Sequence, residues 1–502
     1  MARYKDIKVS FVLLVTMGLI FLLFSLTQAQ QKPKVYEFNF SEVKPLCKFN
    51  VPEKYKAFWN DIIEAKKKGQ SEEQITGMTE KRHGIGIKDY NKVLSEIGIP
   101  RKFVEYTKDC MLNRKPVLEL LFKGALTPPK GTPQYDDAVE AVLPAVFKAL
   151  KPYSDKLRVK PVLYPGGVLG DEPDYIRKIK LGEIQWAGGT IVMGEMVAPE
   201  VSVFDLPFLF DYEPKEYYDD LSFCQIDWIL DKAGPSVNKF LVDRGFVLVG
   251  LLDGGAYECI ATSKIPVTKA DDLKRLTFFM LPQARISGEI CKAYGFKKTL
   301  VCKIWDLPSL AATGMLDAVV CCWYWHVIIQ GTPYYKYVTD YPIRGFLAAI
   351  ALAQKDMFDV LIDLTSGFGP MFGMDRELGL KMTRTLLSDI YTLIRGIMRR
   401  NLRIKEAEAR REIVKRGIYT VVNFPEGEIN KLKEKVLPLY NSLADKKNTY
   451  PKWFLDEVLK YRDEYRKFKK EGKLTDRWYK KGIFPDGYNI SAWIDTMKVG
   501  NR

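Results

Sequence analysis

The sequence predicts an α/β protein, because segments typical of strands alternate with segments typical of helices along its central part. Residues 117–122 read VLELLF, a short apolar run that fits a buried strand. A helix is predicted over residues 136–150, where apolar side chains recur at helical spacing, and the next strand over residues 157–163. Strands and helices that alternate in this way form an α/β sheet, whose ligands bind at the carboxyl ends of the strands.

The first 29 residues are predicted to be a secretory signal peptide. Arg3, Lys5 and Lys8 precede an apolar run over residues 11–24, and small or polar residues follow it up to Ala29. An uncleaved membrane anchor is the alternative, but the run is shorter than the roughly 20 residues that span a bilayer. We therefore expect cleavage near Ala29 and a periplasmic mature protein.

The composition argues against several classes of function. The formal net charge is +15, but basic residues are interleaved with acidic ones and no basic–aromatic motif of a nucleic-acid-binding protein is present. His83 and His326 are the only histidines, and neither CxxC nor HExxH occurs, so we expect no metal, no cofactor and no enzymatic activity. Cys47 and Cys110 bracket the N-terminal helices and could form a disulfide, although the sequence leaves the pairing of the eight cysteines open.

Residues 30–115 are predicted to form a helical extension ahead of the α/β part. Residues 55–64 and 87–97 carry apolar side chains at helical spacing, and Ser71 fits the N-cap of a helix that starts after it.

The most informative stretch is residues 164–186, YPGGVLGDEPDYIRKIKLGEIQW. It predicts a strand end, a glycine turn, a short helix over residues 172–181 and a strand over residues 183–187. The turn Gly188-Gly189-Thr190 follows that strand, where backbone N–H groups can face a cleft and bind an anion.

This stretch, followed by five later segments in the same order, resembles the solute-binding proteins of tripartite ATP-independent periplasmic (TRAP) transporters. The resemblance covers about residues 116–440. The later segments are residues 199–210 (PEVSVFDLPFLF), 245–250 (GFVLVG), 265–276 (IPVTKADDLKRL), 310–318 (LAATGMLDA) and 405–422.

The resemblance implies a two-lobed periplasmic solute-binding protein fold with a long inter-lobe helix, plus the N-terminal helical extension and a C-terminal tail. The chain would cross between the lobes near Gly254 and again near Val338. We expect a signal peptide (1–29), a helical extension (30–115), lobe I (116–254 and 339–375), lobe II (255–338 and 401–449), the long helix (376–400) and a basic aromatic tail (450–502).

The resemblance also implies where the solute binds. Most family members hold a carboxylate with an arginine in the strand after the "DLKG" segment, and a second basic residue lies on the crossing strand. Phe279 and Tyr257 stand at these positions here, so rings replace the two cations. We therefore expect a solute that is aromatic or largely apolar, with its carboxylate held by the N–H groups at 188–190 or at a helix start after Pro282, helped by Arg285.

The stretch VCCWYWHV, residues 320–327, follows the segment GMLD and reaches the family's polar ligand contact near Cys321. A strand would place Cys321, Trp323 and Trp325 on one face, and Tyr324 would join the cleft only if the strand had ended. A wall of the solute pocket, a structural strand and a metal site remain alternatives here. The predicted ligand-binding residues are Thr190, Tyr257, Phe279, Arg285, Trp305, Cys321, Trp323 and Tyr324.

The function that the resemblance implies is a receptor that closes its lobes on a small organic acid and delivers it to TRAP membrane subunits. The alternative is a diverged sensor that binds a ligand or a partner without transport. The aromatic tail would pack on the lobes or on a second subunit, and the second arrangement would make a homodimer.

Overall fold

The computed structural model describes residues 33–47, 53–86, 98–111, 115–151, 157–329, 333–365 and 376–474, with positions 89, 92 and 96. The signal peptide predicted over residues 1–29 and the tail after residue 474 lie outside the described residues. The chain forms two compact units. Unit 1 takes its described residues from Met1–Phe38, Val51–Leu120 and Tyr153–Arg158, and unit 2 from Asn39–Asn50, Leu121–Pro152 and Val159–Arg502.

Unit 1 is mainly helical, and Ser71 caps a helix as the sequence predicts. The Ser71 hydroxyl accepts a hydrogen bond from the Gln74 backbone N–H, and the Gln74 side chain accepts one from the Ser71 N–H. The unit also holds a strand that the sequence did not predict, with Tyr36 and Phe38 packed edge-on against Tyr106. Its elements are β1 (Val35–Asn39), α3 (Glu53–Lys67), α4 (Glu72–His83) and α6 (Arg101–Met111).

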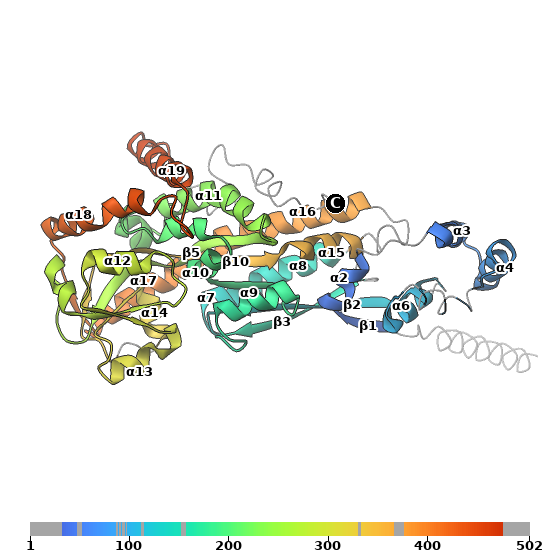
Figure 1. The fold of residues 1–502 in the computed structure, drawn as a ribbon, viewed down its shortest axis with the longest axis horizontal. Helices are drawn as coiled ribbons and strands as arrows, with labels where there is room; N and C mark the ends of the chain where they lie inside the picture. Colours follow the sequence, from blue (N-terminus) through green and yellow to red (C-terminus); the bar gives the residue numbers. More distant parts are fainter. Residues whose placement is uncertain are drawn as a thin grey trace, which may run out of the picture. The chain divides into compact units, whose positions relative to one another are not determined.

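Unit 2 contains two mixed sheets that share one long strand, β5 (Figure 1). The first sheet is built from β2 (Val117–Leu126), which begins in unit 1, with β4 (Trp186–Thr190), β10 (Gly345–Gln354) and β5 (Phe246–Thr262); β3 (Leu157–Pro165) pairs with β2. The second sheet is built from β5 with β8 (Ala318–Cys321), β6 (Thr277–Met280), β7 (Lys298–Val301), β9 (Tyr337–Thr339) and β11 (Thr420–Val422).

The strand β5 carries the chain from one lobe to the other. Its residues 246–258 pair with β10 in the first sheet, and Cys259 to Thr262 pair with β8 in the second. The return runs from β9 to the start of β10. The chain thus passes twice between the two sheets, and the predicted two-lobed α/β fold is confirmed. The lobe boundaries expected near Gly254 and Val338 remain a prediction.

Helices cover both sheets, and no helix among the described residues is both long and apolar enough to cross a membrane. Around the first sheet lie α2 (Phe40–Cys47), α7 (Pro133–Asp137), the π-helical turn η2 (Ala138–Val142), α8 (Leu143–Leu150), α9 (Glu172–Leu181), α10 (Ile191–Val197), η4 (Pro199–Asp205), η5 (Lys215–Asp219), α11 (Gln225–Val242) and α15 (Lys355–Thr365). Around the second lie η6 (Ala270–Arg275), α12 (Ser287–Tyr294), η7 (Ile304–Asp306), α13 (Leu307–Ala312), α14 (Trp323–Ile328) and α18 (Glu426–Leu443), and α19 (Lys452–Lys470) packs on α11.

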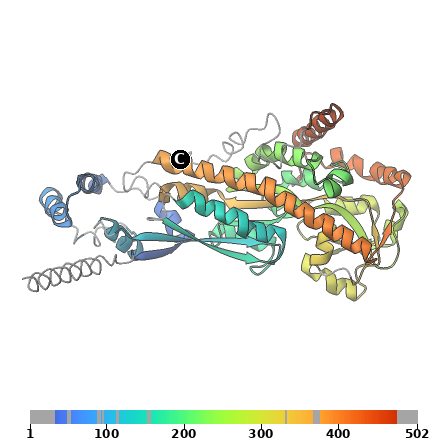
Figure 2. The ribbon, with the colours of Figure 1, turned by 180° about the vertical axis from the view of Figure 1, so that it is seen from behind.

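One continuous helix runs along unit 2 from residue 376 to residue 415 (Figure 2, orange). It consists of α16 (Arg376–Leu393), a π-helical turn η9 (Ile394–Met398) and α17 (Arg399–Lys415). The sequence predicts its apolar stripe, in which Leu386, Leu387 and Ile394 are buried. The predicted end at residue 400 is too early, because the helix continues with inward-facing arginines that have buried carboxylate partners.

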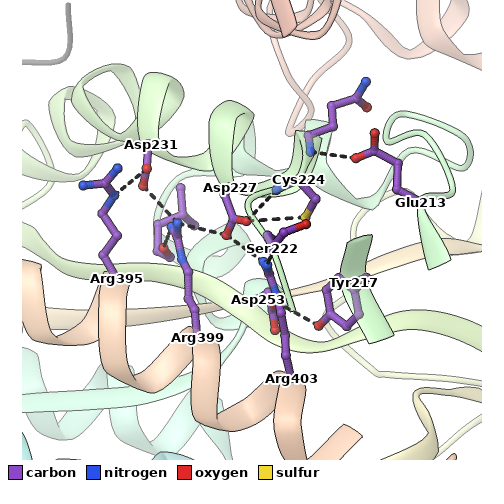
Figure 3. Close-up of polar contacts among 12 residues, drawn as sticks. Glu213, Tyr217, Ser222, Cys224, Asp227, Asp231, Asp253, Arg395, Arg399 and Arg403 are labelled. Atoms are coloured by element: carbon purple, nitrogen blue, oxygen red, sulfur yellow. Dashed lines mark hydrogen bonds and ion pairs between the residues drawn. The ribbon is translucent and has the colours of Figure 1, made fainter. Parts of the chain in front are cut away.

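These arginines form a ladder of buried ion pairs, shown in Figure 3. Arg395, Arg399 and Arg403 are four residues apart, so they project from one face of the helix. The Arg395 Nε donates to Asp231 at 2.5 Å, and Arg399 Nη1 donates to the same carboxylate at 3.0 Å. Arg403 then donates to Asp227 at 2.6 Å and to Asp253 of β5 at 3.0 Å. The ladder therefore attaches the long helix to α11 and to the crossing strand.

The ladder members influence one another's ionisation. Burial disfavours the charge of Arg399, but the carboxylates of Asp231 and Asp227 outweigh this effect and raise its pKa. Burial also raises the pKa of Asp253, and the positive charge of Arg403 opposes that rise. Tyr217 donates its phenolic O–H to Asp253 at 2.9 Å and lies under the Arg403 guanidinium.

We predict that Arg403→Ala lowers the free energy of unfolding by about 3–5 kcal/mol, because it leaves Asp227 and Asp253 buried without their shared cation. Arg400→Ala is the matched control, since Arg400 lies on the exposed side of the same helix and should cost about 0.5 kcal/mol or less. Chemical denaturation of the two variants measures the difference, and equal losses would contradict the structural role of the ladder.

Candidate functional site

Two cavities lie at the carboxyl ends of β2 and β4, where the first lobe meets the second. The cleft cavity, of about 110 Å³, has walls from both lobes, and the inner cavity, of about 80 Å³, extends along the first sheet. Thr127 and Thr190 line both of them. Residues that line the cleft cavity include Gly167, Asp171 and Glu172 from the first lobe, and Pro282, Lys303 and Trp305 from the second.

Gly188, Gly189 and Thr190, which the sequence predicts as a turn, are the last residues of β4, where they pair with β10. Glu172, the first residue of α9, lies at this strand end. Its carboxylate accepts hydrogen bonds from the Thr190 N–H at 2.6 Å, from the Thr190 hydroxyl at 3.0 Å and from the Thr127 hydroxyl at 3.5 Å. Burial raises the pKa of Glu172 to about 7, although these three bonds favour the charged form. The carboxylate also lies against Gly189, where a Cβ would stand 2.5 Å from a carboxylate oxygen.

A second protein carboxylate occupies the other predicted anion site. Helix α12 begins at Ser287, several residues after Pro282, and the N–H of Arg285 donates to the buried carboxylate of Glu195 at 2.8 Å. Burial, together with the negative charge of Asp205, raises the pKa of Glu195 well above its usual value. The N–H groups of Thr190 and Arg285 therefore donate to protein carboxylates in this structure. That the residues around them hold the solute's carboxylate remains a prediction.

Trp305 and Lys303 of the second lobe line the cleft cavity. The Trp305 Nε1 lies so near Gly167 that a Cβ there would be 3.3 Å away, and the φ of Gly167 is +75°. The Lys303 ammonium forms an ion pair with Asp171 of the first lobe at 2.5 Å. Among the described residues that line the two cavities, Lys303 is the one cation.

The stretch VCCWYWHV contains both the end of a strand and the start of a helix. Strand β8 ends at Cys321 and α14 begins at Trp323, so the predicted strand alternation fails after Cys321. Glu406 of the long helix stabilises the start of α14, because its carboxylate accepts hydrogen bonds from the N–H groups of Trp323 and Tyr324, at 2.7 Å each. The helix turns Trp325 toward the inner cavity, where its Nε1 donates to the Gly254 carbonyl at 2.9 Å.

The predicted ligand-binding residues fall into two groups. Thr190 and Trp305 line the cavities. The other six line neither cavity: Tyr257, Phe279, Cys321 and Trp323 are buried, Tyr324 is half-buried with its hydroxyl 3.4 Å from the Gly131 carbonyl, and Arg285 is exposed. A ligand-binding role for any of the eight remains a prediction.

Tyr257, at a position where the resemblance places a cation, packs among other aromatic side chains. Its ring lies edge-on to Tyr212 and Tyr217, 4.9 and 5.3 Å away. Its hydroxyl donates to the Asp211 carbonyl at 2.8 Å and accepts the Glu213 N–H at 3.0 Å. The side chain is therefore part of an aromatic core and not of the cleft.

Trp325 and Glu172 are two of the cavity residues that the sequence-based prediction missed. Both belong to stretches singled out in the sequence, but only the helix start at Trp323 and the hydrogen bonds at the end of β4 show which way they face. Among the described residues, no group of three or more His, Cys, Asp or Glu side chains could hold a metal ion, and six cysteines there are free thiols. The predicted pairing of Cys47 with Cys110 concerns side chains outside those described.

We predict that Glu172→Gln makes stability less dependent on pH. The pKa of Glu172 is raised in the folded chain from 4.5 to about 7, so the folded state holds this proton more tightly and loses stability as pH rises through that window. We compare the free energy of unfolding of Glu172→Gln with that of the unmodified chain. The variant should gain on the unmodified chain between pH 4.5 and 7, by at most about 3 kcal/mol, and the difference should stay level at higher pH. Denaturation at a series of pH values measures it, with exposed Glu183→Gln as the control, and a flat difference for Glu172→Gln would contradict the prediction.

The comparisons with known proteins agree with this architecture. Residues 136–301 match the model of the family described as bacterial extracellular solute-binding protein, family 7. A search of curated proteins found no match. Among solved structures, a TRAP periplasmic solute-binding protein from Shewanella oneidensis with bound succinate aligns with a TM-score of 0.54 and 14% identity, over 68% of this chain and 99% of that chain.

Two further solved structures have similar alignments. A TRAP periplasmic solute-binding protein from Xanthobacter autotrophicus Py2, with bound β-D-galacturonate, gives a TM-score of 0.53 and 19% identity over 68% of this chain and 99% of that chain. A sugar acid binding protein from Advenella mimigardefordensis, in complex with galactonate, aligns with a TM-score of 0.52 and 18% identity. The alignment covers 70% of this chain and 99% of that chain. The resemblance found in the sequence is thus confirmed: residues 136–301 carry the sequence pattern of the family-7 extracellular solute-binding proteins, within the two-lobed α/β fold of TRAP periplasmic solute-binding proteins.

Proposed function

We propose that the protein is an extracytoplasmic solute receptor of a TRAP-type secondary transporter. One observation carries the proposal: the cleft cavity has walls from both lobes, with Glu172 and Thr190 on one side and Pro282 and Trp305 on the other. A solute that contacts both walls stabilises the closed arrangement of the lobes by its higher affinity for it. The closed receptor then delivers the solute to TRAP membrane subunits. Export with cleavage near Ala29, and a homodimer, are parts of the proposal.

We further propose that the solute is a small organic acid with an aromatic or largely apolar body. The neighbours with bound succinate or galacturonate suggest the acid, and the cavity walls of this chain suggest the body. Trp305 and Trp325 lie side by side, with ring centroids 6.3 Å apart, one at each cavity. Such rings stabilise a flat or apolar ligand by burial, and by roughly 0.5–1.5 kcal/mol for each well-formed ring pair.

The proposed partner of the solute carboxylate is the Lys303 ammonium. It is exposed and already near Asp171, so a bound carboxylate would compete with or bridge to this ion pair. A single ammonium is a weaker and less directional partner than a bidentate guanidinium. Small dicarboxylates should therefore bind poorly. The comparisons do not favour the alternative of a sensor without transport.

We predict that phenylacetate binds more tightly than succinate in a tryptophan fluorescence titration. Trp305→Ala should weaken phenylacetate binding by about 3 kcal/mol or less, since it removes a wall of the cleft cavity, and Lys303→Gln should weaken it as well. Trp453→Ala is the control, because Trp453 is exposed on α19 and lines neither cavity. Tight succinate binding that Trp305→Ala leaves unchanged would contradict both the site and the solute class.

A further inference from the structure

We infer that the inner cavity is a second subsite, which binds the apolar arm of the solute. This inference rests on the proposed function and extends the proposed site beyond the cleft. The preferred ligand class is then a monocarboxylic acid with its head in the cleft and an extended alkyl or aryl arm behind Thr127 and Thr190. These two threonines line both cavities, so the two cavities adjoin there, and our proposal places the passage of the arm at this point.

The wall formed by the first sheet consists mostly of small residues. Gly188 of β4 pairs with Ala351 of β10, and Ala349, two positions earlier on β10, pairs with Thr190. At Gly188 the space is already limited, since a Cβ would stand 2.8 Å from a methyl carbon of Leu126. Small residues on two adjacent strands leave room above the sheet that larger side chains would fill.

The opposite wall is formed by two π-helical turns. Ala138 and Val142 come from η2, and Ile394 and Met398 come from η9 of the long helix. A π turn holds one residue more than an α turn, which widens the helix locally, and such turns occur often at functional sites. Two helices that widen at the same cavity support the proposal that this space holds part of a ligand, and they do so independently of the sheet.

The test is calorimetric titration of the full chain with acetate, butyrate and hexanoate. In the unmodified protein, each added CH₂ should tighten binding about fourfold while the arm still fits. Ala138→Leu fills the cavity and should abolish this gain while leaving acetate unaffected, and Ala351→Val tests the same point from the opposite wall. Val139→Leu is the control, because Val139 lies in the same π turn but is exposed.

An affinity that stays flat along the series, or equal effects of Ala138→Leu and Val139→Leu, would overturn the second subsite alone. Failure of every acid to bind would contradict both the subsite and the proposed function.

Discussion

The ion pairs of Arg395, Arg399 and Arg403 with Asp231, Asp227 and Asp253 hold the long helix against α11 and β5, and the arrangement of the candidate site depends on this attachment. Each partner is buried, so the pairs cannot be broken without leaving charges in the interior. The same helix supplies the η9 wall of the inner cavity at the Arg395 end of the ladder. On the other side, Glu406 caps α14 and so fixes the direction of Trp325. One rigid element thus positions walls of the site that come from both lobes.

The protein's own carboxylates shape the chemistry of the cleft. Glu172 and Glu195 accept hydrogen bonds from the N–H groups of Thr190 and Arg285, close to the two places where the sequence predicts a solute carboxylate, and burial raises the pKa of both glutamates. The positions where the resemblance places two cations hold Phe279 and Tyr257, which pack into the interior. A site with these properties holds a charged head weakly and an apolar body well. This is why the proposed solute differs from the succinate and sugar acids seen in the neighbouring structures.

The elements that the sequence predicted well are those whose boundaries depend on residues nearby in the chain. The helix over residues 172–181 and the cap at Ser71 were predicted with correct bounds, because an N-cap residue and apolar spacing define them within a few positions. The long helix was predicted up to residue 400 but not beyond, since its buried arginines look like surface residues until their partners on α11 are known. Similarly, α14 begins at Trp323 because of a carboxylate 83 positions further along the chain, which no local pattern reveals.

The candidate site was predicted less completely than the fold. Thr190 and Trp305 follow strand ends, and the rule that ligands bind there was sufficient to place them at the cavities. The direction of Tyr257 depends on the aromatic residues of a separate segment, and the inner cavity depends on two π-helical turns, a feature that apolar periodicity does not indicate. Both are consequences of tertiary packing.

The most direct measurement for the central claim is native mass spectrometry of the exported protein purified under mild conditions, followed by identification of any small molecule released on denaturation. The account predicts one bound monocarboxylic acid with an alkyl or aryl arm, and loss of the bound mass in Ala138→Leu. A bound dicarboxylate or sugar acid that Ala138→Leu retains would contradict it.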